Sequence, residues 1–586
     1  MPVPANAEIA ELLENIADVL EIKGESVFRI RAYRDAARSL ESLSSPVQEM
    51  IARGEHVSGI GESIAAKITE FVETGHCAYY DEIKKQINPG TAELIAVPGI
   101  GPKKAQLFAE QLGIDSIDKL ERAARDHVLS KIHKIGEKTE GNILDAIERI
   151  RGRSERVPLG TALPGAMPFL DTIRAFPEVR RADFAGSLRR MRDTIGDLDL
   201  LACADEPSAV IDKFVALPGV KSVLGHGPTK GTIVTDENLQ VDLRVVKPEE
   251  YGAGLQYFTG SKAHNIKLRS IAEAQGLKVN EYGIFRVSDN ERIAGETEEG
   301  MYETLGLSWV PPEIREDEGE IEAARAKKLP VLVTVADLKG DLHLHTNWSD
   351  GAESPEAMVK AGIERGYEYI TISDHSVSMG FIHGLTLERI MEQKALIDKL
   401  NGKYPDIHIL HGIEVNIRAD GSLDYEDEVL ARFDVVTASI HGGMGMSKEK
   451  MTARIIRAIR NPHVDVIGHP TGRIIGKREP YEVDIDAVMD AAARSGTALE
   501  INSQPDRLDL KETYARRAKS RGILVAIDSD AHASAQLGLV TYGIATARRG
   551  WIEAKDVVNA LSLVDLQNWL RRSETVQRGK AKRRAA

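Results

Sequence analysis

Hydrophobic and polar residues alternate with different periods in different parts of the chain. Residues 1–150 form short segments with apolar side chains every three or four positions, which predicts amphipathic helices and few strands. From about 157 to 310, strand-like runs such as NLQVDLRVV and NEYGIFRV are mixed with helical segments. Beyond 339, apolar strands alternate with helices to about 570, which predicts an α/β barrel or sheet.

Length and composition agree with a multidomain globular protein. A chain of 586 residues favours about three or four domains. No apolar run approaches the ~20 residues of a membrane span, and acids in MPVPANAEIAELLENIADVL argue against an export signal. The two cysteines, Cys77 and Cys203, match no zinc spacing, so we expect a reduced, cytoplasmic protein.

The charge distribution excludes the coating of nucleic acid by a general positive field. The net charge is −14, and residues 1–150 hold 18 Lys and Arg against 25 Asp and Glu. The basic tail 571–584 is more typical of a solvated end than of a binding arm. Residues 311–328, PPEIREDEGEIEAARAKK, carry six acids within ten positions after two prolines, which predicts an interdomain linker with a helical part.

Glycine turns before helices repeat in the helical part. VSGIGESIAAKI (57–68) and VPGIGPKKAQLF (97–108) lie 40 residues apart, and the degenerate copy IHKIGEKTEGNI follows 35 later. Free backbone N–H groups at such helix starts hold phosphate oxygens without net positive charge. A single turn of this kind is more often an ordinary cap. The repeat predicts helix-hairpin-helix contacts to the DNA backbone, at Gly59, Gly61, Gly99, Gly101 and Gly136.

Three acids predict a metal site in the middle part. GDLDLL places Asp197 and Asp199 on one side of a strand, and VDLRVV places Asp242 on a second strand. Three converging carboxylates suit two Mg²⁺ ions, which support attack by a 3′-hydroxyl on a triphosphate. A lone Asp-x-Asp motif is weak evidence for a metal site. Here the upstream turn AGSLRR adds a Gly-Ser turn and two arginines that suit phosphate. Together they indicate a nucleotidyltransferase.

GSLRRMRDTIGDLDLL, VDLRVV and YFTGSKAHNIKLR (257–269) together resemble the family X DNA polymerases, over about residues 5–310. The resemblance implies that Asp197, Asp199 and Asp242 are catalytic ligands of Mg²⁺ or Mn²⁺. It also implies three groups of contacts to the incoming nucleotide. These are Gly186, Ser187 and Arg190 at the triphosphate, Tyr257, Phe258 and Gly260 at the sugar, and Asn265 and Arg269 at the nascent base pair and template. Gln240 and Lys262 depart from the family's usual arginine and acid.

The same resemblance raises a lyase activity. Lys67 falls where the family's lyase domain carries the lysine that attacks an abasic sugar. Ser63 stands where a second lysine is common in the family, and Phe28 replaces a polar residue. A surface lysine that contacts phosphate is the alternative, and the sequence leaves both open.

Ten of the 16 histidines lie in the last part, and six of them end strand-like runs, as in KGDLHLHT and VVTASIHGG. The C-terminal ends of successive strands are where a TIM-like barrel gathers its active site. Any one of these histidines alone suits a packed core. All six beside Asp350, Glu414 and Asp530 would otherwise be many costly buried polar groups, so the pattern predicts a metal centre.

These motifs resemble the PHP (polymerase and histidinol phosphatase) family over about residues 339–570. The resemblance implies three sets of ligands. They are His343, His345, Glu414 and Asp530 for one ion, Asp350, His375 and His532 for a second, and a bridging Glu414 with His441 and His469 for a third. Mixed imidazole and carboxylate ligands suit two or three Mn²⁺ or Zn²⁺ ions, and the sequence does not choose between them. His383, His408, His411 and His463 receive no role.

The sequence thus predicts an enzyme with an all-α helix-hairpin-helix part, an α+β palm and thumb, and a distorted TIM-like α/β barrel of about seven strands. We expect these boundaries: a helical 8-kDa-like domain (1–85), a fingers-type domain (86–152), the palm (153–250), the thumb (251–310), a linker (311–338), the PHP domain (339–570) and a basic tail (571–586).

The combined resemblance implies a repair enzyme that fills short gaps in DNA, with gapped or primer–template DNA and dNTPs as substrates. We expect no membrane partner, and a monomer is the default because no oligomerisation signal stands out. The PHP site would act as a 3′–5′ exonuclease, with abasic-site endonuclease and 3′-phosphatase activity as further options. Three alternatives stay open: a PHP scaffold that only tethers DNA, a phosphatase for small esters, and a chain that binds DNA ends without catalysis.

Overall fold

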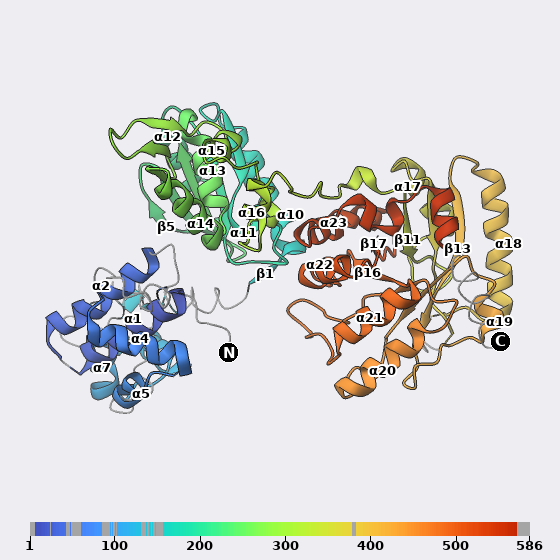
Figure 1. Cartoon of the computed structure of the whole chain (residues 1–586), viewed down its shortest axis with the longest axis horizontal. Helices are drawn as coiled ribbons and strands as arrows, with labels where there is room; N and C mark the ends of the chain where they lie inside the picture. Colours follow the sequence, from blue (N-terminus) through green and yellow to red (C-terminus); the bar gives the residue numbers. More distant parts are fainter. Residues whose placement is uncertain are drawn as a thin grey trace. The chain divides into compact units, whose positions relative to one another are not determined.

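The computed structural model divides the chain into two compact units, Met1–Arg156 and Val157–Ala586 (Figure 1). It describes residues 6–23, 25–42, 60–74, 76–84 and 102–129, isolated positions among the rest of the first unit, and then 156–377 and 383–570. Gly59, Gly99, Gly101 and the basic tail lie outside the described residues. None of the described helices combines the length and the apolar character that crossing a membrane requires.

The described part of the first unit is entirely helical. Its helices are α1 (Asn6–Ile22), α2 (Val27–Ser42), α4 (Glu62–Thr74), α5 (Ala78–Lys84), α7 (Pro102–Leu112) and α8 (Ile117–Arg125). Leu13 and Ile68 belong to one hydrophobic core, formed by α1, α2, α4 and α5, and Phe108 and Leu120 belong to another. Two cores of this kind confirm the predicted all-α part.

The palm is built on a five-stranded sheet with the strand order β2-β4-β7-β6-β5. The strands are β2 (Arg181–Phe184), β4 (Leu198–Cys203), β5 (Val220–His226), β6 (Lys230–Thr235) and β7 (Gln240–Val246), with the short pair β1 (Val157–Pro158) and β3 (Thr194–Ile195) beside them. β4 and β7 run parallel, and the other neighbours in the sheet are antiparallel. Helices α10 (Leu159–Arg174) and α12 (Pro207–Val215) bury apolar side chains such as Leu170 and Phe214 in the core of the palm.

The thumb follows as a helical pair and a small antiparallel sheet. Its elements are α13 (Tyr251–Thr259), α14 (Lys262–Ala274), β8 (Leu277–Asn280), β9 (Gly283–Arg286), β10 (Arg292–Ala294) and α15 (Glu298–Thr304). The expected linker contains η3 (Pro312–Ile314), α16 (Glu320–Arg325) and η4 (Val335–Asp337). Ile314 and Ile321 are buried in the core of the thumb, because this segment carries apolar residues among its acids. The segment thus packs onto the thumb.

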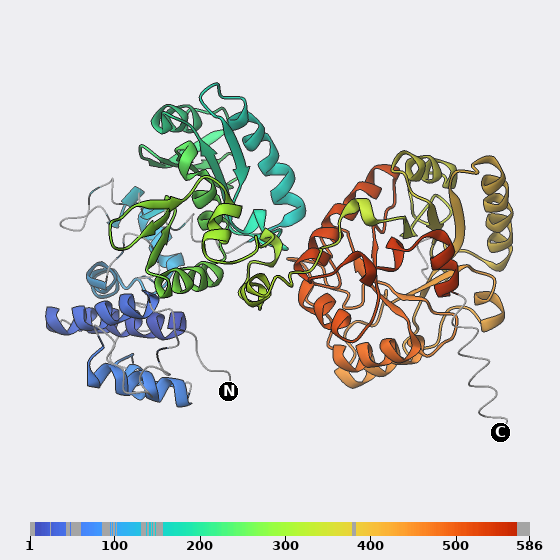
Figure 2. The ribbon, with the colours of Figure 1, turned by 45° about the horizontal axis from the view of Figure 1, so that its top comes forward.

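Seven parallel strands form a nearly closed barrel in sequential order. They are β11 (Gly340–Leu344), β12 (Tyr369–Ile372), β13 (His408–Asn416), β14 (Val435–Ser439), β15 (Val466–Ile467), β16 (Ala498–Asn502) and β17 (Val525–Asp528). A bridge between Leu344 and Ala531 joins the first and last strands. Helices surround the strands (Figure 2): α17 (Pro355–Glu364), α18 (Leu387–Lys403), α19 (Asp427–Leu430), α20 (Lys448–Ile459), α21 (Ile485–Ser495), α22 (Glu512–Ser520) and α23 (Val540–Arg549). The predicted barrel of about seven strands is confirmed.

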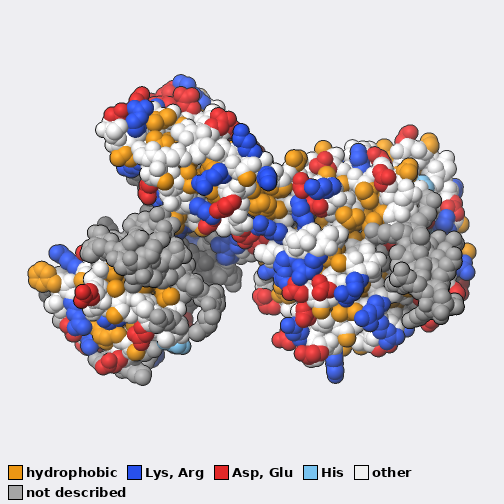
Figure 3. All heavy atoms as spheres, in the orientation of Figure 1, with side chains coloured by type: hydrophobic (Ala, Val, Ile, Leu, Met, Phe, Trp, Pro, Cys, Tyr) orange, Lys and Arg blue, Asp and Glu red, His pale blue; other side chains and the backbone are white. Residues whose placement is uncertain are grey.

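Charges of both signs are interspersed on the face of the molecule that Figure 3 draws. On the face drawn in Figure 3, Lys and Arg side chains alternate with Asp and Glu. A surface of this kind fits the net charge of −14 and the expectation that contacts to nucleic acid use local geometry.

One buried carboxylate joins the palm to the thumb. Glu298, which is 5% exposed, accepts hydrogen bonds from Arg189 at 2.7 Å and from the fully buried Arg315 at 2.6 Å. The indole of Trp309 donates to the same carboxylate at 3.2 Å. Burial opposes the charged form, but the two guanidinium groups outweigh it and lower the pKa of Glu298 to about 2.

We predict that Glu298→Gln lowers the free energy of unfolding at pH 7 by about 3 kcal/mol, because the fully buried Arg315 and the partly buried Arg189 lose their counter-charge. A lowered pKa stabilises the fold above the unfolded-state value of about 4.5, and this contribution disappears as the pH falls toward about 2. Urea titrations followed by tryptophan fluorescence test both points. The difference in the free energy of unfolding between wild type and Glu298→Gln should become smaller below pH 4.5. The exposed neighbour Glu299→Gln is the control, and equal midpoints for Glu298→Gln and Glu299→Gln would contradict the prediction.

Candidate active sites

Three aspartates meet at one end of the palm sheet. Asp199 on β4 and Asp242 on β7 are paired directly across the two parallel strands, and Asp197 immediately precedes β4. One carboxylate oxygen from each lies within 4.8 Å of the others. Burial, followed by repulsion from Asp197 and Asp242, raises the pKa of Asp199 to about 7. The predicted convergence is found, and such an oxygen cluster fits divalent cations.

Neighbouring strands hold the third acid in place. Thr232 on β6 donates a hydrogen bond to Asp242 at 2.5 Å, and Gln240 donates to its other oxygen at 2.6 Å. Lys230 forms an ion pair with Asp242 at 3.0 Å. Gln240 was noticed in the sequence only as a departure from the family. Thr232 and Lys230 were missed, because their proximity depends on the pairing of β6 with β7.

A glycine lets the turn before the acids approach them. Gly186 begins the short helix α11 (Gly186–Arg189), which also contains Ser187, and its φ is +58°. A Cβ at this position would lie 1.9 Å from Oδ2 of Asp199. Any side chain would therefore displace the carboxylate, so the close approach requires glycine.

Arg190 directly follows α11 and reaches the thumb. It donates from Nη1 to the carbonyl of Thr259 at 2.5 Å and from Nε to Glu316 at 3.1 Å. A Cβ on Gly260 would lie 3.2 Å from the same Nη1. The predicted contacts to triphosphate and sugar thus come from neighbouring parts of the palm and thumb.

The other predicted nucleotide contacts lie on α13 and α14. The rings of Tyr257 and Phe258 meet edge to face, with centroids 5.2 Å apart. Asn265 donates to the carbonyl of Tyr257 at 2.7 Å and accepts a hydrogen bond from Gln256. Arg269 lies one helical turn after Asn265, and so on the same face of α14. The structure therefore places Asn265 against the segment that carries Tyr257 and Phe258, with Arg269 one turn further along α14.

Two sequence predictions of the first unit fall on described residues. At Gly61, directly before α4, an added Cβ would meet no heavy atom within 4 Å, so space is open for close approach to this backbone; the same holds at Gly136. Lys67 donates to the carbonyl and hydroxyl of Ser63 at 2.9 and 3.0 Å and lies 4.8 Å from the ring centroid of Tyr79. Phe28 is 84% exposed. The lyase role of Lys67 stays a prediction.

The ends of the barrel strands gather the second site. Of the nine predicted ligands, His343 and Glu414 lie on β11 and β13, while Asp350 lies in a loop after β11. The others directly follow strands: His345 after β11, His375 after β12, His441 after β14, His469 after β15, and Asp530 and His532 after β17. All of them contact another member of the set at 3.9 Å or less.

Glu414 lies at the centre of this cluster. It is 1% exposed, and its oxygens lie 2.9 Å from Nδ1 of His375, 3.2 Å from Nε2 of His441 and 3.1 Å from Nε2 of His469. His343 lies 3.5 Å away. Burial opposes ionisation, but the surrounding imidazoles hold the pKa of Glu414 well below its usual range. A second subset joins Asp350 to His375 and His532, at 3.4 and 3.3 Å.

The donor atoms fit divalent metal ions. Among the described residues, buried ring nitrogens of His343, His345, His375, His441 and His469 have no hydrogen-bond partner. Burial and the adjacent His375 lower the pKa of His345 to about 3, so this imidazole is neutral and offers a lone pair. Unpartnered buried imidazoles beside carboxylates are costly unless an ion completes them.

Further residues orient the predicted ligands, and the sequence did not reveal them. Glu500 on β16 accepts a hydrogen bond from Nδ1 of His343 at 2.6 Å and from the backbone N–H of His469 at 2.5 Å. Asn502 donates to Asp530 at 2.9 Å. His469 and Asp530 have φ values of +28° and +49°, a backbone conformation that residues other than glycine rarely adopt.

Two histidines without a predicted role lie apart from this cluster. His411 is buried against Phe433, and its ring meets the side-chain oxygen of Gln393 at 3.2 Å, which makes it part of the core. The side chain of His383 is exposed next to residues outside the described ranges.

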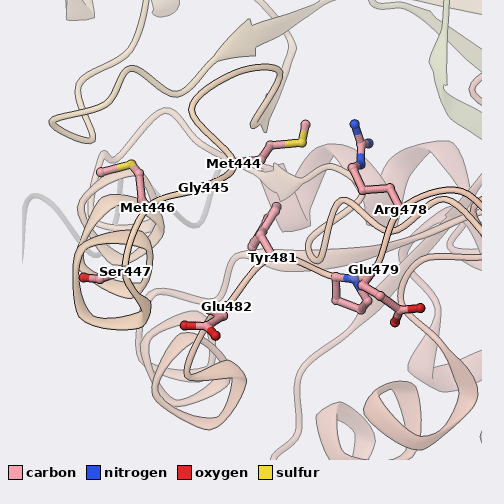
Figure 4. A pocket seen from close by; sticks show the side chains of 9 residues that line it. Met444, Gly445, Met446, Ser447, Arg478, Glu479, Tyr481 and Glu482 are labelled. Atoms are coloured by element: carbon pink, nitrogen blue, oxygen red, sulfur yellow. The ribbon is translucent and has the colours of Figure 1, made fainter.

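A pocket of about 590 Å³ lies between the loops that follow His441 and His469. Figure 4 shows Met444 and Met446 on one loop and Arg478 and Tyr481 on the other. Tyr481 donates to the carbonyl of Pro470 at 2.6 Å, immediately after a predicted ligand. A volume of this size accommodates a group as large as a nucleotide.

Comparison with known proteins agrees with both sites. Family models match residues 4–77 (helix-hairpin-helix domain), 91–149 (SAM-like helix-hairpin-helix tandem), 254–316 (DNA polymerase beta thumb) and 341–504 (PHP domain). A Bacillus subtilis (strain 168) protein named DNA polymerase/3'-5' exonuclease PolX is 38% identical over 97% of this chain and 99% of its own length. The chain belongs to the PolX family of DNA polymerases. Both resemblances drawn from the sequence are thereby confirmed.

Proteins that are similar to the barrel domain of this chain alone are named as phosphatases. Probable phosphatases from Thermoanaerobacter sp. (strain X514) and Caldanaerobacter subterraneus are 33% and 32% identical, over 37% and 34% of this chain. The matched segments make up 89% and 78% of the lengths of these two phosphatases. In the PolX family the barrel is therefore combined with a polymerase core, whereas these relatives match this chain over about a third of its length.

We predict that Glu500→Gln lowers the affinity of the barrel for Mn²⁺ or Zn²⁺ by about 10- to 100-fold, because the ring of His343 loses a charged acceptor. Isothermal titration of chelator-treated protein measures this change. The exposed Glu364→Gln is the control, with unchanged affinity expected. Equal affinities for the two variants would show that Glu500 does not orient the ligands.

Proposed function

We propose that the chain is a DNA-directed DNA polymerase that fills short gaps during repair and carries a metal-dependent 3′–5′ exonuclease in its barrel. The observation that carries the proposal is the presence of two complete sites in one compact unit, the aspartate triad and the nine-ligand cluster. The relative from Bacillus subtilis, whose name contains both activities, supports the pairing. Gapped DNA and dNTPs are the proposed substrates, and a single chain is the proposed working unit.

In the polymerase site, Asp197, Asp199 and Asp242 would hold Mg²⁺ or Mn²⁺. Such ions supply charge neutralisation for the triphosphate and activation of the 3′-hydroxyl. The protein's own contribution is geometric. Gly186 and Ser187 offer backbone and hydroxyl donors, and Gln240 with Thr232 fixes the orientation of Asp242.

The remaining polymerase contacts would recognise the rest of the nucleotide. Arg190 would bind the triphosphate, as arginine does wherever planar donors meet phosphate oxygens. Tyr257, Phe258 and Gly260 would enclose the sugar, and Asn265 and Arg269 would contact the nascent pair. Support comes from the hydrogen bonds that link Arg190 to Thr259, next to Gly260, and Asn265 to Tyr257.

In the barrel, the nine ligands would hold two or three Mn²⁺ or Zn²⁺ ions. Bound ions of this kind polarise a phosphate ester and lower the pKa of water. Glu414 would bridge two of them, which its contacts with imidazoles on both of its oxygens favour. His345, kept neutral by burial and by the adjacent His375, would retain a lone pair for an ion. The pocket at Met444 and Arg478 offers room for the end of a DNA strand.

We predict that Asp199→Asn lowers nucleotide incorporation by about three orders of magnitude and leaves primer shortening intact, because only the palm loses a metal ligand. Extension of a 5′-labelled primer in a one-nucleotide gap, with dNTP and Mn²⁺, measures the effect. The exposed Asp236→Asn serves as the control. Unchanged extension by Asp199→Asn would refute the assignment of the triad.

The reciprocal prediction concerns the barrel. His343→Ala should abolish shortening of the same primer without dNTP, because a buried ligand of the cluster is lost, and should leave extension within about twofold of wild type. His463→Ala, which lies outside the cluster, should retain both activities. Shortening by His343→Ala at the wild-type rate would remove the exonuclease from this site.

A phosphatase for small esters is the second candidate for the barrel, favoured by the names of the Thermoanaerobacter and Caldanaerobacter relatives. Hydrolysis of p-nitrophenyl phosphate without DNA, at a rate above that on a DNA primer and lost in His343→Ala, would support it. Preference for the DNA 3′ end would support the exonuclease.

A further inference from the structure

Helix α23 of the barrel domain contacts the polymerase site directly. Arg549, the last residue of α23, is 6% exposed. Its Nη1 donates to the main-chain carbonyl of Arg190 at 2.9 Å and to the carboxylate of Glu316 at 3.1 Å. A residue of the PHP domain thus binds both the backbone of the proposed triphosphate ligand and that ligand's counter-charge.

Glu316 is the centre of this arrangement. Its Oε1 accepts hydrogen bonds from Arg190 at 3.1 Å, from Arg549 at 3.1 Å and from Arg192 at 3.5 Å. The neighbouring cations and hydrogen bonds overcome burial and lower the pKa of Glu316. Arg549 is in turn paired with Glu512 of α22 at 3.2 Å, so the barrel side carries its own counter-charge.

Other contacts hold the barrel domain against the palm. Arg473, in the loop after His469, forms an ion pair with Asp193 at 3.1 Å. Tyr542 on α23 packs against the hydrophobic core of the palm. A Cβ on Gly160 would lie 2.1 Å from Cβ of Pro505, so the two backbones approach closely. The segment from Arg190 to Asp193 is therefore bound to the barrel at both of its ends.

The position of Arg190 follows from these contacts. Its side chain is fixed at Thr259 and Glu316, and its carbonyl is fixed by Arg549. Without Arg549, Glu316 would lose one of two close cations and the carbonyl would lose a buried charged donor. Buried groups left without a partner rearrange, and a shift of about 1 Å in a substrate-binding group is enough to weaken its action.

We propose that Arg549 is a positioning residue for the polymerase reaction: through Glu316 and the backbone of Arg190, the PHP domain sets the triphosphate-binding arginine. The proposal rests on the proposed role of Arg190 at the triphosphate. It makes the barrel domain a structural part of nucleotide binding, in addition to its own chemistry.

The test compares KM for dNTP and kcat in single-nucleotide gap filling by full-length variants. Arg549→Ala should raise KM for dNTP by about tenfold and change kcat by less than about twofold, because ground-state binding of the nucleotide is weakened. Arg549→Lys should give an intermediate KM, since it keeps the charge and loses the planar fork. The adjacent Arg548→Ala is the matched control. Arg548 binds Glu313 and the carbonyl of Val333 in the same interface and should leave KM unchanged.

Exonuclease rate and thermal midpoint separate positioning from unfolding. The exonuclease rate should stay near wild type in Arg549→Ala, because Arg549 contacts none of the nine predicted ligands among its described partners. The thermal midpoint should fall, because Glu316 and Glu512 each lose a cation, but it should stay well above the assay temperature. The double variant Arg190→Ala/Arg549→Ala should be no weaker than Arg190→Ala alone, since one residue acts through the other.

The outcomes distinguish a failure of the positioning role of Arg549 from a failure of the proposed role of Arg190 at the triphosphate. If Arg190→Ala leaves KM for dNTP unchanged, the assigned role of Arg190 is wrong, and the inference falls with it. If Arg190→Ala raises KM while Arg549→Ala behaves as Arg548→Ala does, only the inference is overturned. Additive effects in the double variant, or a KM increase matched by loss of exonuclease and by a thermal midpoint near the assay temperature, would also overturn it.

Discussion

The barrel depends on the burial of one carboxylate among imidazoles. Glu414 is almost inaccessible to solvent and meets the rings of His375, His441 and His469 at hydrogen-bonding distances. A charge removed from water in this way is stable only with close partners. Parallel strands in sequential order bring those partners from far apart in the chain to one end of the barrel. The hydrophobic strands thus serve to collect a polar centre that none of them could bury alone.

The palm also brings carboxylates together, but Asp197 and Asp199 are less buried than Glu414. Burial, followed by repulsion from the other two acids, raises the pKa of Asp199, and Lys230, Gln240 and Thr232 bind the carboxylate of Asp242. Divalent ions would complete both centres, by neutralising the aspartates of the palm and by binding the imidazoles and carboxylates of the barrel. The difference in donors, oxygen alone in the palm and nitrogen with oxygen in the barrel, suits different metals.

The sequence identified the side chains that cluster in the two sites, because each lies in a local motif. A histidine that ends an apolar strand, or two aspartates spaced by one residue, can be recognised without knowing what lies beside them. The supporting residues depend on pairing over long sequence distances. Thr232 meets Asp242 only through strand register, Glu500 meets His343 across the barrel, and no local pattern marks them.

Charge density alone does not reveal the packing of the segment 311–338. Its prolines and acids predicted an interdomain linker with a helical part. In the structure Glu320 is fully buried and its carboxylate meets the ring of His264 at 2.6 Å, while Glu316 binds arginines from the palm and from the barrel. Ile314 and Ile321 determine this outcome, because their burial in the thumb brings the neighbouring acids against buried cations. The result is a connection that packs both domains into one unit.

The most direct test of the account is a count of metal ions bound by the full chain, by inductively coupled plasma mass spectrometry after dialysis against metal-free buffer. Wild type reconstituted with Mn²⁺ or Zn²⁺ should retain two or three ions per chain, and Glu414→Gln should retain fewer, while Asp199→Asn should match wild type because the open palm site exchanges its ions readily. An exonuclease-active wild type that retains none, or a Glu414→Gln variant that retains the full number, would contradict a metal centre built on this buried carboxylate.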